Sequence, residues 1–112
     1  MVIILVAVLW IITIIFPIKQ STNEYQQPII NTKNEMIYES QINVDYDIAL
    51  DYNGSTPIVW EIAISNLPDG LKLDPIDGRI YGKPIKSGTY TFAIRASNLA
   101  GYCIEAYTIT IN

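Results

Sequence analysis

The sequence predicts an all-β protein: an antiparallel β-sandwich of six or seven strands, preceded by one N-terminal hydrophobic helix. Three observations lead to this prediction. From Ile42 onward, apolar and polar residues alternate with a period of two, as they do along strands with one buried face. Turn signals separate these runs roughly every 8–12 residues, a spacing typical of sandwiches. No charged side chain precedes Lys19, although the chain holds seven Lys or Arg and eleven Asp or Glu.

The amino-terminal residues 2–18 read VIILVAVLWIITIIFPI, with Thr13 the only polar side chain before Pro17. A helix of this length would measure about 25 Å, close to the roughly 30 Å hydrocarbon core of a bilayer. Lipid offers no partners to backbone N–H and C=O groups, so a helix is the only single segment that suits it. We therefore assign residues 1–19 to a transmembrane anchor or signal segment, with the membrane as a partner through residues 2–18.

Two fates of this segment stay open, a retained anchor and a cleaved signal. A signal peptide begins with basic residues and ends with small residues before the cut, and neither is present here, which favours the anchor. Lys19 is the one basic residue beside the segment, and by the positive-inside rule it would place the C-terminal end of the segment in the cytoplasm. The residues that follow look extracellular, so the orientation of the segment in the membrane also stays open. The predicted location is a membrane-anchored protein with an exported domain, or a secreted or cell-surface protein.

The elements after the apolar segment follow in order. Residues 20–34 are rich in Gln, Asn, Thr and Ser and are interpreted as a polar linker, with residues 28–31 as a candidate first edge strand. Residues 35–112 are assigned to the sandwich. Turns are predicted at residues 51–55, 68–70, 77–78 and 98–101, where Gly, Asn, Asp and Pro gather. The apolar residues expected to share inner faces are Ile42, Val44, Tyr46, Ile48 and Leu50, then Ile58, Trp60, Ile62 and Ile64, then Leu71 and Leu73, then Tyr90, Phe92, Ile94 and Ala96, and finally Tyr107, Ile109 and Ile111.

Four fragments within residues 57–111 occur in a fixed order: PIVWEI, LPDGLKLD, DGRIYGKP and SGTYTFAIRASN. They contain a Trp strand at Trp60, a Leu-Pro-x-Gly-Leu turn at 67–71, a Gly-x-Ile-x-Gly-x-Pro segment at 78–84 and a Gly-Thr-Tyr-x-Phe strand at 88–92. In this series the chain resembles the putative immunoglobulin domain of bacterial surface proteins, a relative of the cadherin-like domains of dystroglycan type. The resemblance covers about half the chain well and residues 29–50 more loosely.

The resemblance implies an immunoglobulin-like sandwich with a non-catalytic role at the cell surface, as a structural spacer or an adhesion and binding module. Its ligand would be an unidentified protein or glycan. Two alternatives stay open: a calcium-dependent cadherin-like adhesion module, and a carbohydrate-binding module of a larger or truncated protein. A flat group of exposed tyrosines would favour glycan binding, and the candidates are Tyr25, Tyr52, Tyr81 and Tyr102.

Composition argues against catalysis and nucleic-acid binding. The chain has no histidine, so it lacks the commonest general base, and Cys103, its single cysteine, has no His partner and no disulfide partner. Asp45 and Asp47 share a strand face, but a lone sandwich offers no cleft between two acids. A net charge of −4 without a basic cluster does not suit phosphate backbones. We therefore expect no enzyme, no catalytic residue and no nucleic-acid partner.

Calcium is the remaining cofactor to consider, because it takes six to eight oxygen ligands and acids gather near the predicted turns. The spacing Asp51-x-Asn53-Gly54 is loosely similar to a calcium loop, but no acid follows at the required distance. An ordinary turn with exposed acids is the simpler interpretation, so no cofactor is assigned. The calcium candidates are Asp45, Asp47, Asp51, Asn53, Asp74 and Asp77.

Overall fold

The computed structural model describes residues 24–37 and 39–112, so the hydrophobic helix expected over residues 2–18 lies outside the described residues. Within the described ranges, no helix has the length and apolar character needed to cross a bilayer. Their helical content is one short 3-10 turn, η1 (Asn34–Met36). The rest is strands and loops, and the all-β prediction is confirmed for this part of the chain.

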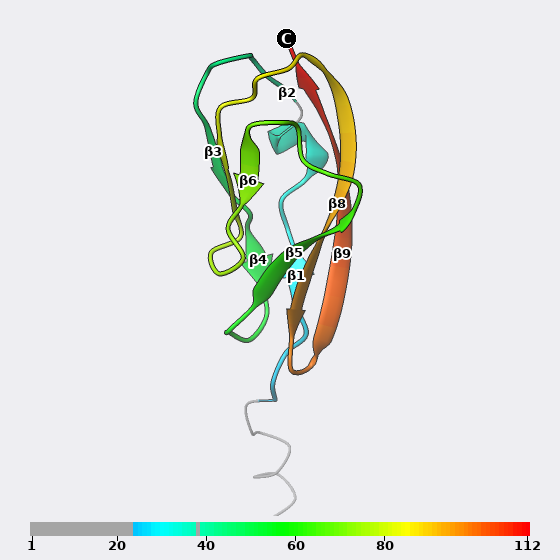
Figure 1. The fold of residues 1–112 in the computed structure, drawn as a ribbon. Coiled ribbons are helices and arrows are strands. Elements are labelled where there is room, and N and C mark those ends of the chain that lie inside the picture. The colour runs from blue at the N-terminus through cyan, green and yellow to red at the C-terminus, as the bar shows by residue number, and fades with distance from the viewer. Residues whose placement is uncertain (1–23, 38) are drawn as a thin grey trace, which may run out of the picture.

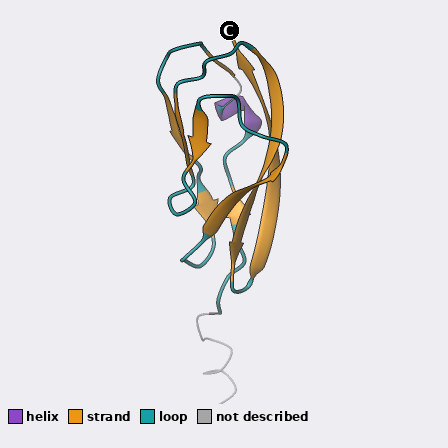
Figure 2. Ribbon diagram, in the orientation of Figure 1, coloured by secondary structure: helices purple, strands orange, loops and turns teal. Residues whose placement is uncertain are grey.

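Two sheets face each other and form the sandwich (Figures 1 and 2). The first has the order β2-β9-β8-β5, the second has the order β3-β7-β6, and β1 and β4 form a small antiparallel pair. All pairings are antiparallel except that of β2 with β9. The strand bounds are β1 (Ile29–Ile30), β2 (Glu39–Ser40), β3 (Tyr46–Ala49), β4 (Tyr52–Asn53), β5 (Val59–Ile64), β6 (Leu71–Leu73), β7 (Arg79–Gly82), β8 (Gly88–Asn98) and β9 (Gly101–Ile111).

The core lies between the two sheets and is built from the alternating residues of the long strands. Trp60, Phe92 and Tyr107 are its largest members, each at most 2% exposed, and the rings of Phe92 and Tyr107 lie 6.0 Å apart. Burial of side chains of this kind stabilises the fold by about 1.5–3 kcal/mol each. The inner faces predicted for β8 and β9 are confirmed, because Phe92, Ile94, Ala96, Tyr107, Ile109 and Ile111 are buried and Tyr90, partly buried, packs against the core.

Two of the predicted inner-face residues point to solvent instead. The register between β5 and β8 shifts between Ile62 and Ile64, and this bulge turns Ile64 outward, where it is 64% exposed. Because side chains alternate with a period of two, one extra residue in a strand exchanges its faces. Val44 is 49% exposed because β3 begins only at Tyr46, after a turn at Asn43 with φ 61°.

Residues that the sequence analysis placed in the linker pack against the sandwich. Pro28, Ile30 and Thr32 are buried. The hydroxyl of Tyr107 donates to the Thr32 carbonyl at 2.8 Å, and the Thr108 N–H donates to Asn34 Oδ1 at 2.6 Å. This segment therefore runs along β9 and covers one edge of the larger sheet, which protects an otherwise open strand edge. The strand predicted near residues 28–31 is present as β1.

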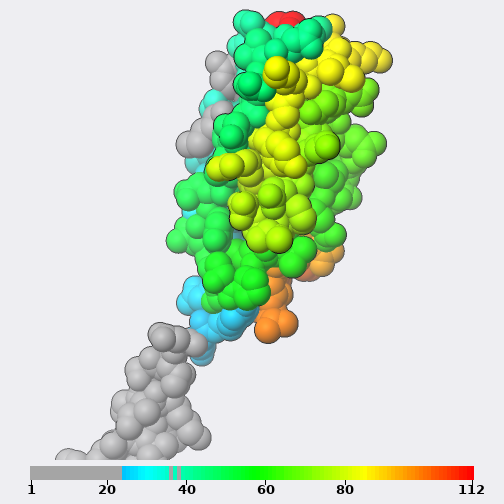
Figure 3. All heavy atoms as spheres, turned by 60° about the vertical axis from the view of Figure 1, so that its left-hand side comes forward, coloured from blue at the N-terminus to red at the C-terminus, as the bar shows by residue number. Residues whose placement is uncertain are grey.

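The described chain begins at one pole of the sandwich and ends at the other. Figure 1 marks the C end at the top and shows β8 and β9 running between the two poles, and in Figure 3 the colours run from blue at the base, for the first described residues, to red at the top. At the base, the Gln27 side chain donates to the Tyr102 carbonyl at 2.9 Å. At the top, the backbone of Asn112 pairs with Ser40 and Ile42.

Candidate functional site

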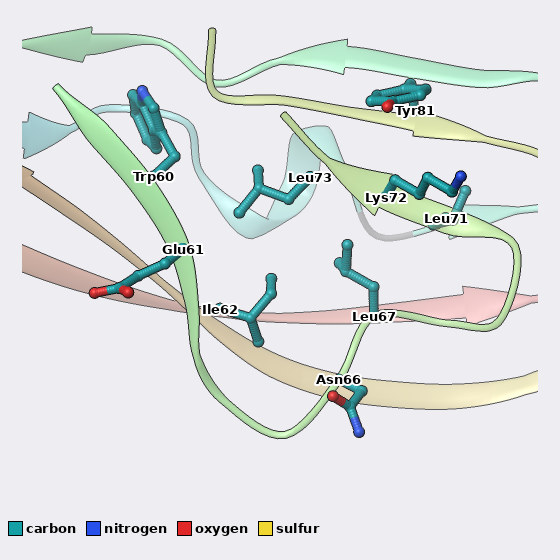
Figure 4. A pocket seen from close by; sticks show the side chains of 9 residues that line it. All are labelled: Trp60, Glu61, Ile62, Asn66, Leu67, Leu71, Lys72, Leu73 and Tyr81. Carbon is teal, nitrogen blue, oxygen red and sulfur yellow. The ribbon is translucent and has the colours of Figure 1, made fainter. Parts of the chain in front are cut away.

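A groove opens on the side of the sandwich where both sheets end, between β5 and β6. It has a volume of about 470 Å³ (Figure 4). Apolar side chains from both sheets form its floor, and polar groups from Glu61, Asn66, Lys72 and Tyr81 stand around it. The floor residues are Trp60, Ile62, Leu67, Leu71 and Leu73.

The turn before β6 sets one wall of this groove. The Leu71 N–H donates to the Pro68 carbonyl at 3.0 Å, which closes the turn. The Ile85 N–H donates to the Asp69 carbonyl at 3.0 Å and so joins this turn to the loop that follows β7. Gly70 has a φ of +96°, and a Cβ there would lie 1.9 Å from the carbonyl oxygen of Lys83. Only glycine permits this approach, which holds β6 and β7 together beside the groove.

Trp60 sets the end of the groove. Its N–H donates to the Pro75 carbonyl at 3.0 Å, and its ring meets Tyr52 edge-on with centroids 5.5 Å apart. Gly78 lies directly against the indole, because a Cβ on Gly78 would fall 2.5 Å from Cε2 of Trp60. The Trp strand and the Asp-Gly turn of the sequence motif are therefore packed against each other, which explains their joint presence.

A second candidate surface lies on the outer face of the larger sheet. Val59, Ile64, Tyr102 and Ile104 are between 46% and 64% exposed there. They surround an ion pair in which Arg95 Nε lies 3.5 Å from Glu61 Oε1, and the Arg95 guanidinium stacks over the Tyr102 ring at 4.3 Å. We name these six residues, Val59, Glu61, Ile64, Arg95, Tyr102 and Ile104, the outer-face patch.

The calcium candidates lie on β3 (Asp47), on β4 (Asn53) and in nearby loops and turns, and several already have partners. Asp47 pairs with Arg79 at 3.1 Å, and Asp45 lies 4.0 Å from Lys83. Asn53 accepts a hydrogen bond from the Asn31 amide. No three acidic or thiol side chains converge as a metal site within residues 24–37 and 39–112.

Asp74 is engaged by its own turn. Its Oδ1 accepts the N–H groups of Ile76 and Asp77 at 2.8 and 3.0 Å. The hydrogen bonds from Asp77 and then from Ile76 hold the pKa of this carboxyl below its ordinary value. Asp77 follows in the same turn, and Asp51 is exposed next to β4. The structure thus assigns Asp74 a turn-forming role that does not require a metal.

The four candidate tyrosines do not form one flat group. Tyr52 is half-buried against Trp60, Tyr81 lies beside the groove, and Tyr102 belongs to the outer-face patch. Tyr25 donates from its hydroxyl to the Thr56 carbonyl at 2.9 Å. Cys103 is half-buried and packs against the core, as expected for a small apolar side chain.

Sequence reasoning named Tyr81 and Tyr102 as candidate binding residues but predicted neither surface as such, for different reasons. The groove could not be predicted because it depends on which strands lie at the sheet edges, and the alternation of apolar and polar residues does not indicate strand order. The outer-face patch has a readable signal, since Val59, Tyr102 and Ile104 occupy positions opposite the predicted inner faces. Ile64 joins them only through the bulge.

Two facing sheets of this order, with a buried Trp on β5, define an immunoglobulin-like β-sandwich module. Within that class, the chain belongs to the family described as Putative Ig domain, whose model matches residues 18–112. The resemblance drawn from the four sequence fragments is thereby confirmed. A search of the curated proteins found no match.

Several solved structures are similar to this chain. Two putative alpha-galactosidases from Bacteroides fragilis match with TM-scores of 0.68 and 26% and 32% identity, over 81% and 76% of this chain but 19% and 17% of theirs. A SusE-like surface located polysaccharide binding protein from Bacteroides thetaiotaomicron matches with a TM-score of 0.55 and 25% identity, over 80% of this chain and 14% of that one. The chain thus spans less than a fifth of these proteins.

More distant similarities concern the fold alone. Protocadherin gamma B7 matches with a TM-score of 0.57 and 13% identity, over 78% of this chain and 24% of that one. A titin fragment matches with a TM-score of 0.52 and 17% identity, over 76% of this chain and 32% of that one. Both immunoglobulin and cadherin domains therefore share this architecture.

Proposed function

We propose that this protein is a non-catalytic immunoglobulin-like module at the cell surface, which acts as a rigid spacer and offers a binding surface. The observation that carries this proposal is the placement of the chain ends described above. The first described residues lie at one pole and Asn112 lies at the opposite pole, and the β8–β9 hairpin spans the distance between them. A module of this form would hold the segment that precedes the sandwich at a fixed distance from the loops at its opposite pole.

A hydrogen-bonded clamp supports the rigidity of the spacer at its base. The Asn98 side chain donates to the Gln26 carbonyl at 2.6 Å and to the Ser55 carbonyl at 2.9 Å. Its Oδ1 also accepts the N–H groups of Ala100 and Gly101. One side chain therefore joins the leading segment, the loop before β5 and the β8–β9 turn.

The comparisons support a surface location and a modular role. One similar structure is a surface located polysaccharide binding protein, and in all three of the bacterial proteins the match is a small part of a longer chain. A domain that recurs as a small part of different proteins suits a spacer or a binding unit rather than a self-sufficient enzyme. We further propose that residues 2–18 anchor the chain in the membrane, with the sandwich exported.

The spacer role is tested by distance measurement in the full chain in lipid nanodiscs. Spin labels at Leu99→Cys and Lys86→Cys, with Cys103→Ala, would mark the two poles. With 11 residues in β9 at about 3.3 Å each, a narrow distance distribution is expected, centred between about 30 and 45 Å. A broad distribution would show that the module does not hold its poles apart and would overturn the spacer role.

The surface location is tested separately on intact cells that express the full chain. Leu99 is 93% exposed at the base turn, so Leu99→Cys should react with a membrane-impermeant maleimide before lysis. The native Cys103 is half-buried and serves as the background control. Labelling that occurs only after lysis would contradict export.

Glycan binding is a second candidate function, and the β5–β6 groove is the observation that favours it. Asn66 and Lys72 offer it hydrogen-bonding groups, and Tyr81 adds an aromatic ring that is 40% exposed. We expect Tyr81→Ala to abolish any glycan-array signal of the wild-type chain, whereas Tyr25→Ala should retain it. An array without any wild-type signal would reject this candidate.

A further inference from the structure

The outer-face patch concentrates apolar surface in one half of an otherwise polar sheet face. The register places Val59 beside Ser97 and Tyr102, Glu61 beside Arg95 and Ile104, and Ile64 beside Ala93 and Ala106. These are three adjacent rows across β5, β8 and β9, which lie side by side in Figure 1. Toward the other pole the same face carries paired threonines, Thr91 with Thr108 and Thr89 with Thr110.

Exposed apolar residues that adjoin one another indicate a contact surface more strongly than scattered ones do. Val59 is 55% exposed, Ile64 is 64% exposed and Ile104 is 46% exposed, and all three flank the same ion pair. The edge of β5 borders this patch, and the Trp60 N–H on that edge donates to the Pro75 carbonyl, whereas the far edge of β9 is covered by residues that precede β3.

The charges of the patch indicate what would bind it. It carries one acid and one base, Glu61 and Arg95, in one row on neighbouring strands. A partner with charge of a single sign would leave one of them opposed by a like charge. A second copy of the same surface, turned by a two-fold axis, offers the opposite charge at both positions.

We propose that the outer-face patch binds a second copy of this chain, face to face, with Glu61 of each copy opposite Arg95 of the other. A two-fold axis parallel to the strands and between β5 and β8 produces this arrangement. The same axis sets Val59 opposite Ser97 and places Ile64 over the row of Ala93, which is itself only 3% exposed. Tyr102 and Ile104, on β9, flank this contact. The inference concerns this surface alone and does not depend on the spacer role.

The size of the patch predicts a weak contact. The axis between β5 and β8 overlays only these two strands, because β9 lies beyond the β5 edge of the other copy. Two strands at about 4.8 Å spacing and six residues at about 3.3 Å cover roughly 190 Å² per copy, against about 800 Å² per partner in a stable complex. Such an interface would form between copies held on one surface and dissociate readily in dilute solution. The expected dissociation constant lies between about 0.1 and 1 mM.

The test uses charge exchange in the full chain, by sedimentation equilibrium in density-matched detergent at up to about 1 mM of protein. Glu61→Lys alone and Arg95→Glu alone each place like charges opposite each other in a homodimer, so each should weaken self-association at least about tenfold. An equimolar mixture of the two variants pairs opposite charges again at both positions. The mixture should recover association to within about threefold of the wild type.

A matched pair of isoleucine variants tests the apolar part of the patch. Ile64→Ser should weaken self-association about tenfold, whereas Ile76→Ser should leave it unchanged. Ile76 is 80% exposed but lies in the turn between β6 and β7, outside the patch. Thermal unfolding of each variant establishes that it is folded. Association through residues outside the patch is the same in every variant, so differences between variants report on the patch.

Recovery in the mixture, together with the loss in Ile64→Ser, supports the proposal. A wild-type chain that stays monomeric at about 1 mM overturns it. Single variants that associate like the wild type, or a mixture that stays as weak as its components, also overturn it, since the Glu61–Arg95 row would then have no role between copies.

Discussion

Gly78, in the Gly-x-Ile-x-Gly-x-Pro segment, packs directly against the core residue Trp60. It has a φ of +68°, and a Cβ would overlap the Trp60 ring at 2.5 Å from Cε2. Trp60 is 2% exposed and is held by Tyr52, so it cannot move away without opening the core. We expect Gly78→Ala to lower the free energy of unfolding by about 2–4 kcal/mol, measured by urea denaturation of the full chain.

Gly88→Ala is the matched control for this variant. Gly88 also has a positive φ, +145°, but its Cβ would meet nothing closer than a Tyr90 ring atom at 3.4 Å. Its substitution should lower the free energy of unfolding by about 1 kcal/mol, from backbone strain alone. Equal losses at both positions would show that the contact with Trp60 does not matter.

Tyr107 has a buried hydroxyl that forms a hydrogen bond with a backbone carbonyl. It is 1% exposed, and it donates to the Thr32 carbonyl at 2.8 Å. Tyr107→Phe keeps the ring but leaves that carbonyl without its donor, so it should lower the free energy of unfolding at pH 7 by about 1–2 kcal/mol. Tyr81→Phe, at an exposed position, should change it by less than about 0.5 kcal/mol. A harmless Tyr107→Phe would mean that water replaces the hydroxyl.

The buried phenols also link folding to alkaline pH. Burial raises the pKa of Tyr46 to about 12, and burial, followed by the charge of Glu105, raises the pKa of Tyr107. In the unfolded chain a tyrosine titrates near pH 10. The folded state therefore holds these protons more tightly, so this stability is complete below about pH 10 and is lost as pH rises through the folded-state values.

We expect the free energy of unfolding to fall as pH rises above about 10, and Tyr46→Phe to make that fall shallower. Urea titrations at pH 8 and at intervals above pH 10 measure both slopes. Parallel slopes in the variant and the wild type would contradict the burial of Tyr46 as the cause.

At the scale of elements, the clamp around Asn98 decides whether the leading segment belongs to the module. Asn98 makes two donated and two accepted hydrogen bonds there, and the Gln26 N–H adds a bond to Ser55 Oγ at 2.7 Å. Asn98→Ala removes the hydrogen bonds of the clamp, so amide exchange in residues 24–30 should accelerate about tenfold or more, while residues 105–111 stay protected. Mass spectrometry of deuterium uptake measures both segments.

Asn66→Ala is the control for the clamp, because Asn66 is exposed beside the groove and outside this network. It should leave uptake in residues 24–30 unchanged. If Asn98→Ala also left it unchanged, the leading segment would be held by the burial of Pro28 and Ile30 rather than by the clamp.

The elements also show how far alternation can be read as structure. For β8 and β9, the predicted inner faces match the buried residues because each strand runs without interruption from one pole to the other. For β5, the prediction is right at Trp60 and wrong at Ile64, because a bulge is set by its neighbour strand rather than by composition. The β5–β6 groove could not be predicted, since it depends on sheet order.

Considered as a whole molecule, the sandwich is held by its apolar core and by backbone pairing, with acids left on the surface. The six calcium candidates were readable from the sequence only as oxygen-bearing residues near turns, and their positions relative to one another depend on the fold. In the structure Asp47 pairs with Arg79 and Asp74 caps its own turn. These contacts give Asp47 and Asp74 structural roles.

The response of the whole module to calcium follows from this placement. A ligand that binds the folded state stabilises it by an amount that grows with its concentration over the dissociation constant. Since no three acids converge in the described part of the chain, about 5 mM Ca²⁺ should shift the thermal midpoint by less than about 1 °C relative to EDTA. Mg²⁺ at equal ionic strength controls for screening of the Asp45–Lys83 and Asp47–Arg79 pairs. A rise specific to Ca²⁺, abolished by Asp51→Asn or Asp77→Asn, would instead show a calcium site and favour the calcium-dependent alternative.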